Sequence, residues 1–279
     1  MIVIRFWALA ALIGLIGCAA PDTQKADAIT KTQLNALLPA DAILLGEQHD
    51  APDHQRIHQL TTATLTQQNK LAALVLEMAN AGQSTERLAP NASEDQVRAA
   101  LQWEVEAWPW TAYSPAVMTA VRVGVPVLGA NLPRTRLKEA MTDTGLDARL
   151  PAPAFKEQQQ NIREGHCELL PESQISPMTR IQIARDVSIA HTLLKATRPG
   201  KTVLLLAGGG HVNRLLGVPL HLPPDFMAKS VLLTAESATA AIKNKAEFDQ
   251  FWFARPAPVV DYCADFSAQR SRQQPATIQ

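Results

Sequence analysis

The sequence has no excess of charge of either sign, and this limits the partners that it can have. Its 26 lysine and arginine residues are balanced by 26 aspartate and glutamate residues, and no basic cluster stands out along the chain. A protein that binds nucleic acid needs a basic surface to neutralise the phosphates. The composition therefore predicts that nucleic acid is not a partner.

Aromatic residues are scarce and prolines are frequent. Aromatic residues make up 5% of the chain, and 19 prolines are distributed along it. This composition is typical of helices and strands joined by many short loops, and not of a disordered chain.

Long apolar runs are absent apart from one at the amino terminus. Phe6 to Gly17 are uncharged and follow a single positive charge at Arg5. The run is too short to span a bilayer comfortably and matches the h-region of a secretory signal. It ends in the Leu-Ile-Gly sequence before Cys18, which resembles the bacterial lipobox, in which the cysteine becomes the lipidated first residue. We therefore expect a signal peptide over 1–17 and attachment to a membrane through Cys18.

The predicted cleavage divides the chain into three parts. Residues 18–40 are expected to hold the lipidated end, a polar tether and the start of the first helix, and residues 41–279 to form the domain, a length that suits one α/β unit. Ala19, and not aspartate, follows the cysteine. By resemblance to sorted lipoproteins, we expect the outer membrane, facing the periplasm. In an exported protein, Cys167 and Cys263 are expected to form a disulfide, with two buried free thiols as the alternative.

Apolar runs and helical patterns alternate along the predicted domain. The runs 42–46, 71–77, 125–130, 202–208 and 230–236 have the length and composition of buried strands. Between them, 53–68 reads as a helix with Asp53 as a possible N-cap, Ser93 and Gln96 have the spacing of a capping box, and 176–197 forms a third helix that stops before Pro199. The alternation predicts a single α/β domain with a mostly parallel sheet covered by helices on both faces.

Acid-base side chains follow three of the predicted strands. Glu47 and His49 follow the first strand, Glu77 ends the second, and His211 comes after Gly208–Gly210. Parallel strands bring their carboxyl ends to one edge, so these four side chains should cluster there. They could act as general acid and base, or His49, Glu77 and His211 could hold a metal ion. The alternative is that they only brace the loops.

The glycine run supports a further, non-enzymatic interpretation. Three glycines permit left-handed backbone, and the residues after His211 look helical. Free amides at the start of such a helix would meet an anion. A small anionic ligand at Gly208–Gly210 is therefore a third possible function.

Several motifs, in order, resemble the ChaN-like family of bacterial haem-binding lipoproteins. They cover residues 40–255 and are "LLGEQHD", "DHQRIHQ", "LVLEM", "ANLPR", "GHCELLPE" with "RDVSIAHTLL", and "LLLAGGGHVNRLLGVP". The family is similar in core to the Tiki metalloproteases and the erythromycin esterases, which use glutamate-histidine strand ends, here Glu47, His49, Glu77 and His211, for hydrolysis. The resemblance implies haem binding in iron uptake as the main function, with an outer-membrane haem or siderophore receptor as a partner. Hydrolysis is the alternative.

The resemblance also implies how haem would be held. Haem needs an axial ligand, an apolar slot and partners for its propionates. The family implies a homodimer with two stacked haems, a tyrosine on each iron, and a histidine and a lysine of the opposite subunit near the propionates. The chain has two tyrosines. Tyr113, in the tryptophan-rich "WEVEAWPWTAYSP", is taken as the ligand on an exposed apolar surface, against core packing as the alternative; Tyr262 is the second choice.

Four of the seven histidines are candidates for haem or metal contacts. His54 and His58 lie four residues apart, so their side chains share one face of the predicted helix. With His49 and His211 they are candidates to meet haem; the alternative is that they are two surface histidines. The remaining histidines are expected to be structural: His166, His191 and His221.

Overall fold

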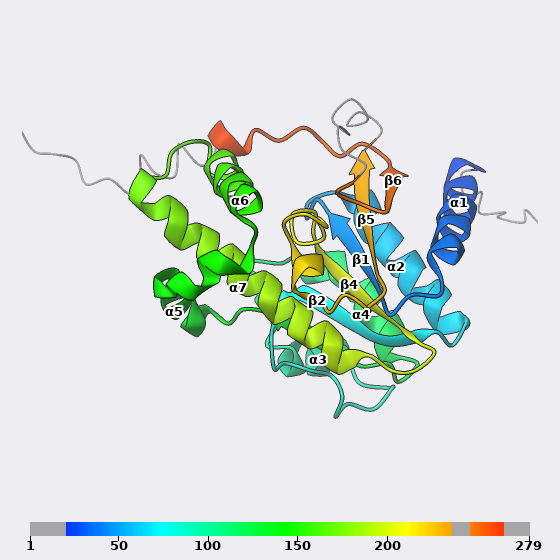
Figure 1. The fold of residues 1–279 in the computed structure, drawn as a ribbon. Helices are drawn as coiled ribbons and strands as arrows, with labels where there is room; N and C mark the ends of the chain where they lie inside the picture. Colours follow the sequence, from blue (N-terminus) through cyan, green and yellow to red (C-terminus); the bar gives the residue numbers. More distant parts are fainter. Residues whose placement is uncertain (1–20, 236–245, 265–279) are drawn as a thin grey trace, which may run out of the picture.

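A six-stranded parallel sheet forms the centre of the molecule (Figure 1). The computed structural model describes residues 21–235 and 246–264. In chain order, the strands of this part are β1 (Ala42–Glu47), β2 (Leu71–Asn80), β3 (Val127–Asn131), β4 (Thr202–Gly208), β5 (Ala228–Ala235) and β6 (Gln250–Ala254). They lie in the order β3-β2-β4-β1-β5-β6, and every neighbouring pair is parallel. The predicted fold class is confirmed.

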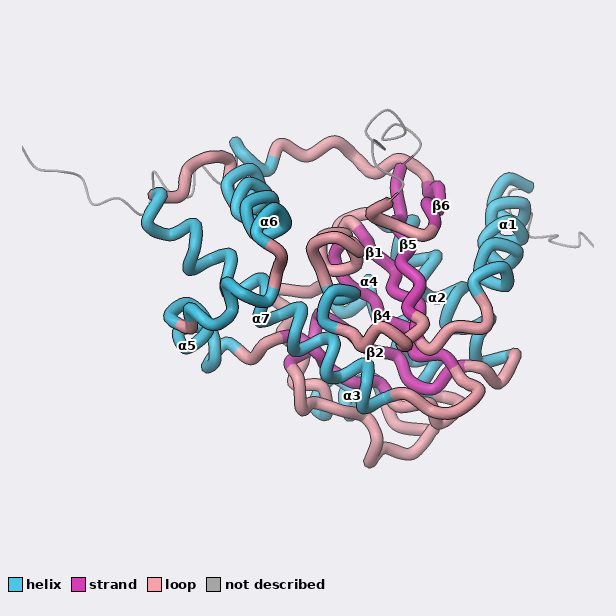
Figure 2. Tube along the Cα trace, in the orientation of Figure 1, coloured by secondary structure: helices cyan, strands magenta, loops and turns pink. Residues whose placement is uncertain are grey.

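Helices cover both faces of this sheet (Figure 2). One face packs against α1 (Pro21–Leu37), α2 (Pro52–Gln67), α3 (Glu94–Ala100) and α4 (Trp110–Val121). The other packs against α7 (Glu172–Ala196), which in turn carries α5 (Leu137–Thr142) and α6 (Ala152–Gly165). Short 3-10 helices lie in the connections, at Arg134–Arg136, Thr144–Arg149 and Val218–His221.

Successive residues of the central strands contribute to two separate cores. In β1, Ile43 and Leu45 join the core beneath α2 and α4, whereas Ala42 and Leu44 join the core beneath α7. Side chains alternate between the two faces of a strand, so a strand covered on both faces is apolar along its length, here up to Glu47 at its carboxyl end. All residues of β1 are buried for this reason.

The helix boundaries follow the sequence signals with one correction. The capping box of Ser93 and Gln96 is confirmed, and α7 ends at Ala196, before Pro199 as predicted, although it begins at Glu172. The N-cap assigned to Asp53 is wrong. α2 begins at Pro52 after Ala51, and Asp53 lies in its first turn, bonded to Arg56.

Several elements were not predicted, among them the helices α4, α5 and α6 and the strand β6. β6 is a short edge strand that pairs only with β5, and only two of its five residues are buried, so its sequence carries little periodic signal. Most of the expected tether is helical, because α1 starts at Pro21 and packs Leu34 and Leu37 into the core. The predicted signal peptide and Cys18 lie outside the described residues.

The carboxyl-terminal segment is bound to the far side of the domain by the expected disulfide. Cys167 and Cys263 are joined, with 5.5 Å between their Cα atoms and a sequence separation of 96. Residues 255–264, called the strap below, run from β6 across the carboxyl edge of the sheet to α6 (Figure 1). Closing a loop of this length stabilises a fold by about 4–5 kcal/mol in the chain-entropy model. The alternative of two free thiols is wrong.

Candidate functional site

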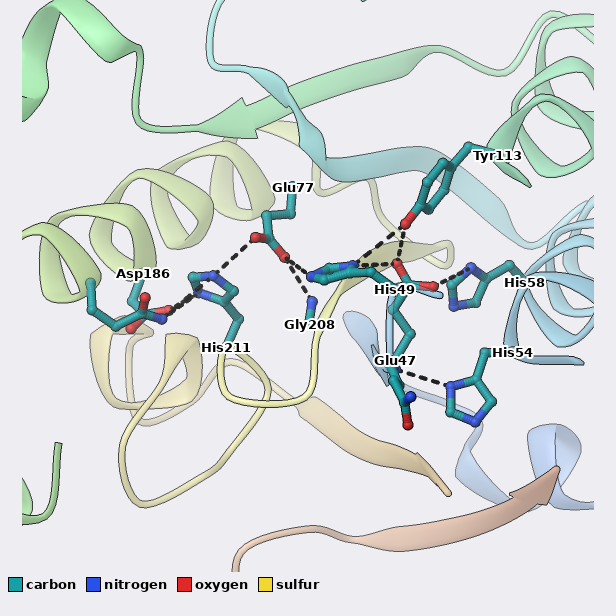
Figure 3. A network of polar contacts seen from close by, with 11 residues as sticks. Glu47, His49, His54, His58, Glu77, Tyr113, Asp186, Gly208 and His211 are labelled. Carbon is teal, nitrogen blue, oxygen red and sulfur yellow. Dashed lines mark hydrogen bonds and ion pairs between the residues drawn. The ribbon is translucent and has the colours of Figure 1, made fainter. Parts of the chain in front are cut away.

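The four acid-base side chains meet at the carboxyl edge of the sheet, as their strand positions predict (Figure 3). His49 Nδ1 lies 2.8 Å from Glu47 Oε1, and its Nε2 lies 3.8 Å from Glu77 Oε2. On the other side of Glu77, His211 Nε2 lies 3.3 Å from Oε1. The result is a continuous chain of alternating carboxylates and imidazoles, called the edge network below.

The strand register explains why a glycine is needed here. Glu47 on β1 lies opposite Gly208 on β4, and the Gly208 amide donates to Glu77 Oε2 on β2 at 2.7 Å. A Cβ atom on Gly208 would come within 2.9 Å of His49 Nε2. The absent side chain therefore lets the two strands and the imidazole meet.

The conformation predicted for the glycine run is wrong. Gly208, Gly209 and Gly210 are not among the glycines with positive φ, and turns, not a helix, follow them. Two of the three amides already have partners, because Gly208 donates to Glu77 and Gly209 donates to the Glu47 carbonyl. The structure therefore gives no support to an anion site at these amides.

Asp186 completes the edge network and was missed by sequence reasoning. Its Oδ1 lies 2.6 Å from His211 Nδ1, and only 1% of the residue is exposed. It belongs to the buried face of α7, in the sequence "RDVSIAHTLL". An aspartate among the apolar positions of a buried helix face is the signal that could have found it, since an ionised carboxylate there needs a partner.

Glu77, Asp186 and His211, the buried members of the edge network, determine its charges at neutral pH. Burial alone would lower the pKa of His211, but the charges of Glu77 and Asp186 raise it to about 10. Burial alone would raise the pKa of Glu77, and His211 lowers it to about 2. Burial raises the pKa of Asp186 to about 6, against the attraction of His211. At neutral pH, His211 is therefore an imidazolium held between two carboxylates.

His49 is the member of the edge network that reaches solvent. Its side chain is 36% exposed, whereas that of Glu47 is fully buried. Burial lowers the pKa of His49, but the hydrogen bond to Glu47 and the charges of Glu77 and Glu47 together outweigh this and raise it overall. The His49 ring also packs edge-on against Trp108 at 4.8 Å between ring centroids. An outside molecule would therefore meet the edge network at His49.

Tyr113 lies in the core, which contradicts its prediction as an exposed iron ligand. Only 1% of it is exposed, and its hydroxyl donates to Glu47 Oε1 at 2.7 Å. Trp103 and Trp108 pack around its ring, so the tryptophan-rich stretch is core and not an apolar surface. Burial and the Glu47 carboxylate raise its pKa, which keeps it a neutral phenol.

His54 and His58 share a helix face as predicted, but that face is buried. Each is 1% exposed, and they lie beside Glu47 (Figure 3). His54 Nδ1 accepts the Gln48 amide at 3.0 Å, and His58 Nδ1 lies 3.7 Å from Glu47 Oε2. Burial lowers the pKa of His58, and burial with His58 lowers that of His54 to about 4. Neither ring is a surface histidine, and neither is placed to meet haem.

These neutral histidines make stability dependent on pH. The unfolded chain protonates His54 near its ordinary pKa of 6.5, whereas the folded protein resists protonation until about pH 4. Stability is then present above pH 6.5 and lost as pH falls toward 4. His54→Gln keeps an acceptor for the Gln48 amide. We expect this variant to lose less folding stability than wild type between pH 7.5 and 5, by on the order of 2 kcal/mol. Urea unfolding at both pH values measures this. His191→Gln, at an exposed position, is the control. If wild type and His54→Gln lost the same free energy of unfolding between pH 7.5 and 5, the assignment to His54 would be contradicted.

Tyr262, the second choice for iron ligand, is at the surface. It is 53% exposed on the strap, and its hydroxyl donates to Asp50 Oδ2 in the loop that follows β1. The bond to Asp50 raises its pKa. Other apolar side chains of this region are also exposed: Phe253, Val259 and Val260.

Comparison with known proteins assigns the chain to a family. Residues 33–222 match the family model described as haem-binding uptake, Tiki superfamily, ChaN. The chain belongs to this family. Haem is therefore the cofactor that the family assigns, in agreement with the resemblance of the motifs. A search of curated proteins finds no match.

Solved structures are also similar to this chain, to different degrees. ChaN of Campylobacter jejuni, described with cofacial haem binding, has a TM-score of 0.66 and 23% identity, covering 81% of this chain and 92% of its own. The type III effector HopBA1 has a TM-score of 0.43 and 14% identity, with coverage of 74% and 82%. A mutant of the erythromycin esterase EreC has a TM-score of 0.38 and 13% identity, with coverage of 74% and 72%.

The metal-site alternative has no support in this ChaN-family protein. Within 21–235 and 246–264, no group of three or more histidine, cysteine, aspartate or glutamate side chains has a geometry that could hold a metal ion. For the predicted set of His49, Glu77 and His211, the reason is visible. Both nitrogens of His211 already face carboxylates, Nε2 that of Glu77 at 3.3 Å and Nδ1 that of Asp186 at 2.6 Å.

The histidines expected to be structural differ in their surroundings. His166 Nδ1 lies 2.7 Å from the Ile162 carbonyl, and His221 is half-buried in the turn that ends at that residue. His191, in contrast, is exposed. With Lys195 and Arg198 it lines a cavity of about 500 Å³ between α7 and the β3 edge. The structural role of His191 therefore stays a prediction, which this exposure does not test.

Proposed function

We propose that this ChaN-family protein binds haem through Tyr262 and takes part in haem uptake. The observation that carries the proposal is that, of the two tyrosines in the chain, Tyr262 presents its hydroxyl at the surface while Tyr113 is enclosed. Bound haem supplies an iron that can take a phenolate as axial ligand. The Asp50 carboxylate lies beside the phenol and already accepts its hydrogen bond. The exposed apolar side chains of Phe253, Val259 and Val260 suit the porphyrin faces.

The propionates need cationic partners, and α7 offers a pair. The resemblance implies a histidine and a lysine of the opposite subunit. His191 and Lys195 lie one helical turn apart, and both are exposed beside the cavity of about 500 Å³. We therefore propose a homodimer in which haem on Tyr262 of one subunit meets His191 and Lys195 of the other. A dimer also removes the second porphyrin face from water, which one exposed surface cannot do.

Titration with haemin tests this proposal. We expect a saturable Soret shift with the features of a high-spin tyrosinate complex, and light scattering should show conversion to dimers as haemin is added. Absence of any spectral change at micromolar haemin would remove haem binding. Saturable binding by a species that stays monomeric would remove the dimer but keep the ligand.

Membrane attachment through Cys18 is part of the same proposal. The apolar run, the Leu-Ile-Gly sequence before the cysteine and Ala19 after it support a lipoprotein of the outer membrane, facing the periplasm. There it could receive haem from an outer-membrane haem or siderophore receptor. No helix within the described residues has the length and apolar character needed to cross a membrane. Palmitate labelling that persists in Cys18→Ser would contradict lipidation at this position.

A second candidate function is hydrolysis at the edge network. The observation that favours it is the partly exposed imidazole of His49, which is bonded to Glu47 and close to Glu77. A base oriented in this way by a carboxylate could activate water, and His211 with Glu77 would complete the set. Ester and peptide substrates should then be cleaved by wild type and not by His49→Ala. Equal rates for the two proteins would exclude this site.

A further inference from the structure

The strap is fixed to the body of the protein at both ends. At its start, the Arg255 amide donates to Asp53 Oδ2 at 2.8 Å and the guanidinium donates to Asp53 Oδ1 at 2.9 Å. Asp53 is buried in the first turn of α2, so this attachment reaches into the core. At the other end, Cys263 is bonded to Cys167, which follows α6.

Between these attachments the strap has little structure of its own. Residues 255–261 form neither helix nor strand, and Val259 and Val260 are exposed. Tyr262 comes at the end of this segment, directly before the disulfide cysteine, and its hydroxyl reaches Asp50. The covalent bond is therefore one residue away from the phenol, whereas the Arg255 attachment is seven residues away.

This arrangement makes the position of the phenol depend on the disulfide. An exposed hydrogen bond to Asp50 cannot by itself hold a ten-residue segment in one place, because ordering each residue of the segment costs conformational entropy. A covalent closure removes most of that cost before any ligand arrives. A ligand group that is held in its bound geometry in advance loses less freedom on binding.

We infer that the Cys167–Cys263 disulfide is the positioning element of the haem-binding tyrosine, and that its reduction weakens haem binding. The inference rests on the proposed function of Tyr262. A protein or small-molecule dithiol would supply the two electrons and two protons that convert the disulfide into two thiols, and would itself become a disulfide. Reduction then removes the covalent link between the strap and the segment after α6, and Tyr262 keeps only its exposed side-chain hydrogen bonds to Asp50 and Gln48. A cellular dithiol could thus promote release of haem.

The test compares haemin titrations of three full-length proteins: wild type, Cys167→Ser/Cys263→Ser and Tyr262→Phe. We expect the double serine variant to bind haemin roughly 10- to 100-fold more weakly, the range seen when groups that support a ligand are removed. It should still show the tyrosinate spectrum at saturation, because the phenol remains. An unchanged Kd in the double variant, with the spectrum lost in Tyr262→Phe, would overturn the inference while leaving the proposed function intact. A tyrosinate spectrum that persists in Tyr262→Phe would instead overturn the assignment of Tyr262, and with it the inference.

A second preparation covers a folding defect in the double variant. Folded wild type can be reduced, alkylated with iodoacetamide and separated from reagents before titration, with far-UV circular dichroism to confirm its fold. The same weakening is expected. Alkylated protein with wild-type circular dichroism and wild-type Kd would overturn the inference.

Discussion

Tyr262→Phe is expected to abolish the tyrosinate spectrum of the haem complex and to weaken haem binding at least tenfold, or about 1.4 kcal/mol. The phenol is the one tyrosine oxygen at the surface, since the only other tyrosine is enclosed by tryptophans. Phenylalanine keeps the apolar ring and loses only the hydroxyl. Absorption titration with haemin measures both the spectrum and the Kd.

Tyr113→Phe is the matched control, because it removes the same atom from the buried position. Its haem spectrum and Kd should match wild type. Its stability should fall by about 1–3 kcal/mol, because Glu47 loses a buried hydrogen-bond donor. The reverse pattern, with the spectrum lost in Tyr113→Phe and retained in Tyr262→Phe, would return the ligand role to Tyr113 and require the core to open.

Glu77→Gln is expected to cause the largest loss of stability, about 3–5 kcal/mol. Glutamine can still accept the Gly208 amide, but it leaves the buried imidazolium of His211 with one carboxylate where it had two. For a domain of this size the melting temperature should fall by about 10 °C. Thermal unfolding followed by circular dichroism at pH 7 measures it.

Glu139→Gln is the control for this effect. Glu139 also pairs with a cation, Arg136, but on the surface of the short helix α5. Solvent already screens that pair, so the melting temperature should stay at the wild-type value. If Glu77→Gln had the same melting temperature as Glu139→Gln, the edge network would contribute nothing to stability.

The four strand-end residues could be predicted from sequence because one rule covers them all. Each follows or ends a buried parallel strand, and parallel strands share a carboxyl edge. Asp186 could not be found in this way. It lies in the middle of a long helix, and its partner His211 is identified only when α7 packs across the sheet.

The two tyrosines show where local sequence gives the wrong answer. Tyr113 stands among tryptophans and a proline, which is equally compatible with an exposed apolar surface and with a core. Its partner Glu47 lies 66 residues away, so only tertiary packing decides. For the cysteines, in contrast, the pairing followed from their number, because setting aside Cys18 as the predicted lipidation site leaves one possible bridge, between Cys167 and Cys263.

The edge network also constrains the order in which the chain can fold. Glu77 and the Gly208 amide are 131 residues apart, and Tyr113 and Glu47 are 66 apart. Contacts of such separation form late, because closing long loops is entropically costly. Until β4 reaches its place between β1 and β2, the carboxylate of Glu77 is stabilised best by water, which opposes early burial of β2. The residues of the candidate site thus favour burial of β1, β2 and β4 only when these strands lie in the order that they have in the folded sheet.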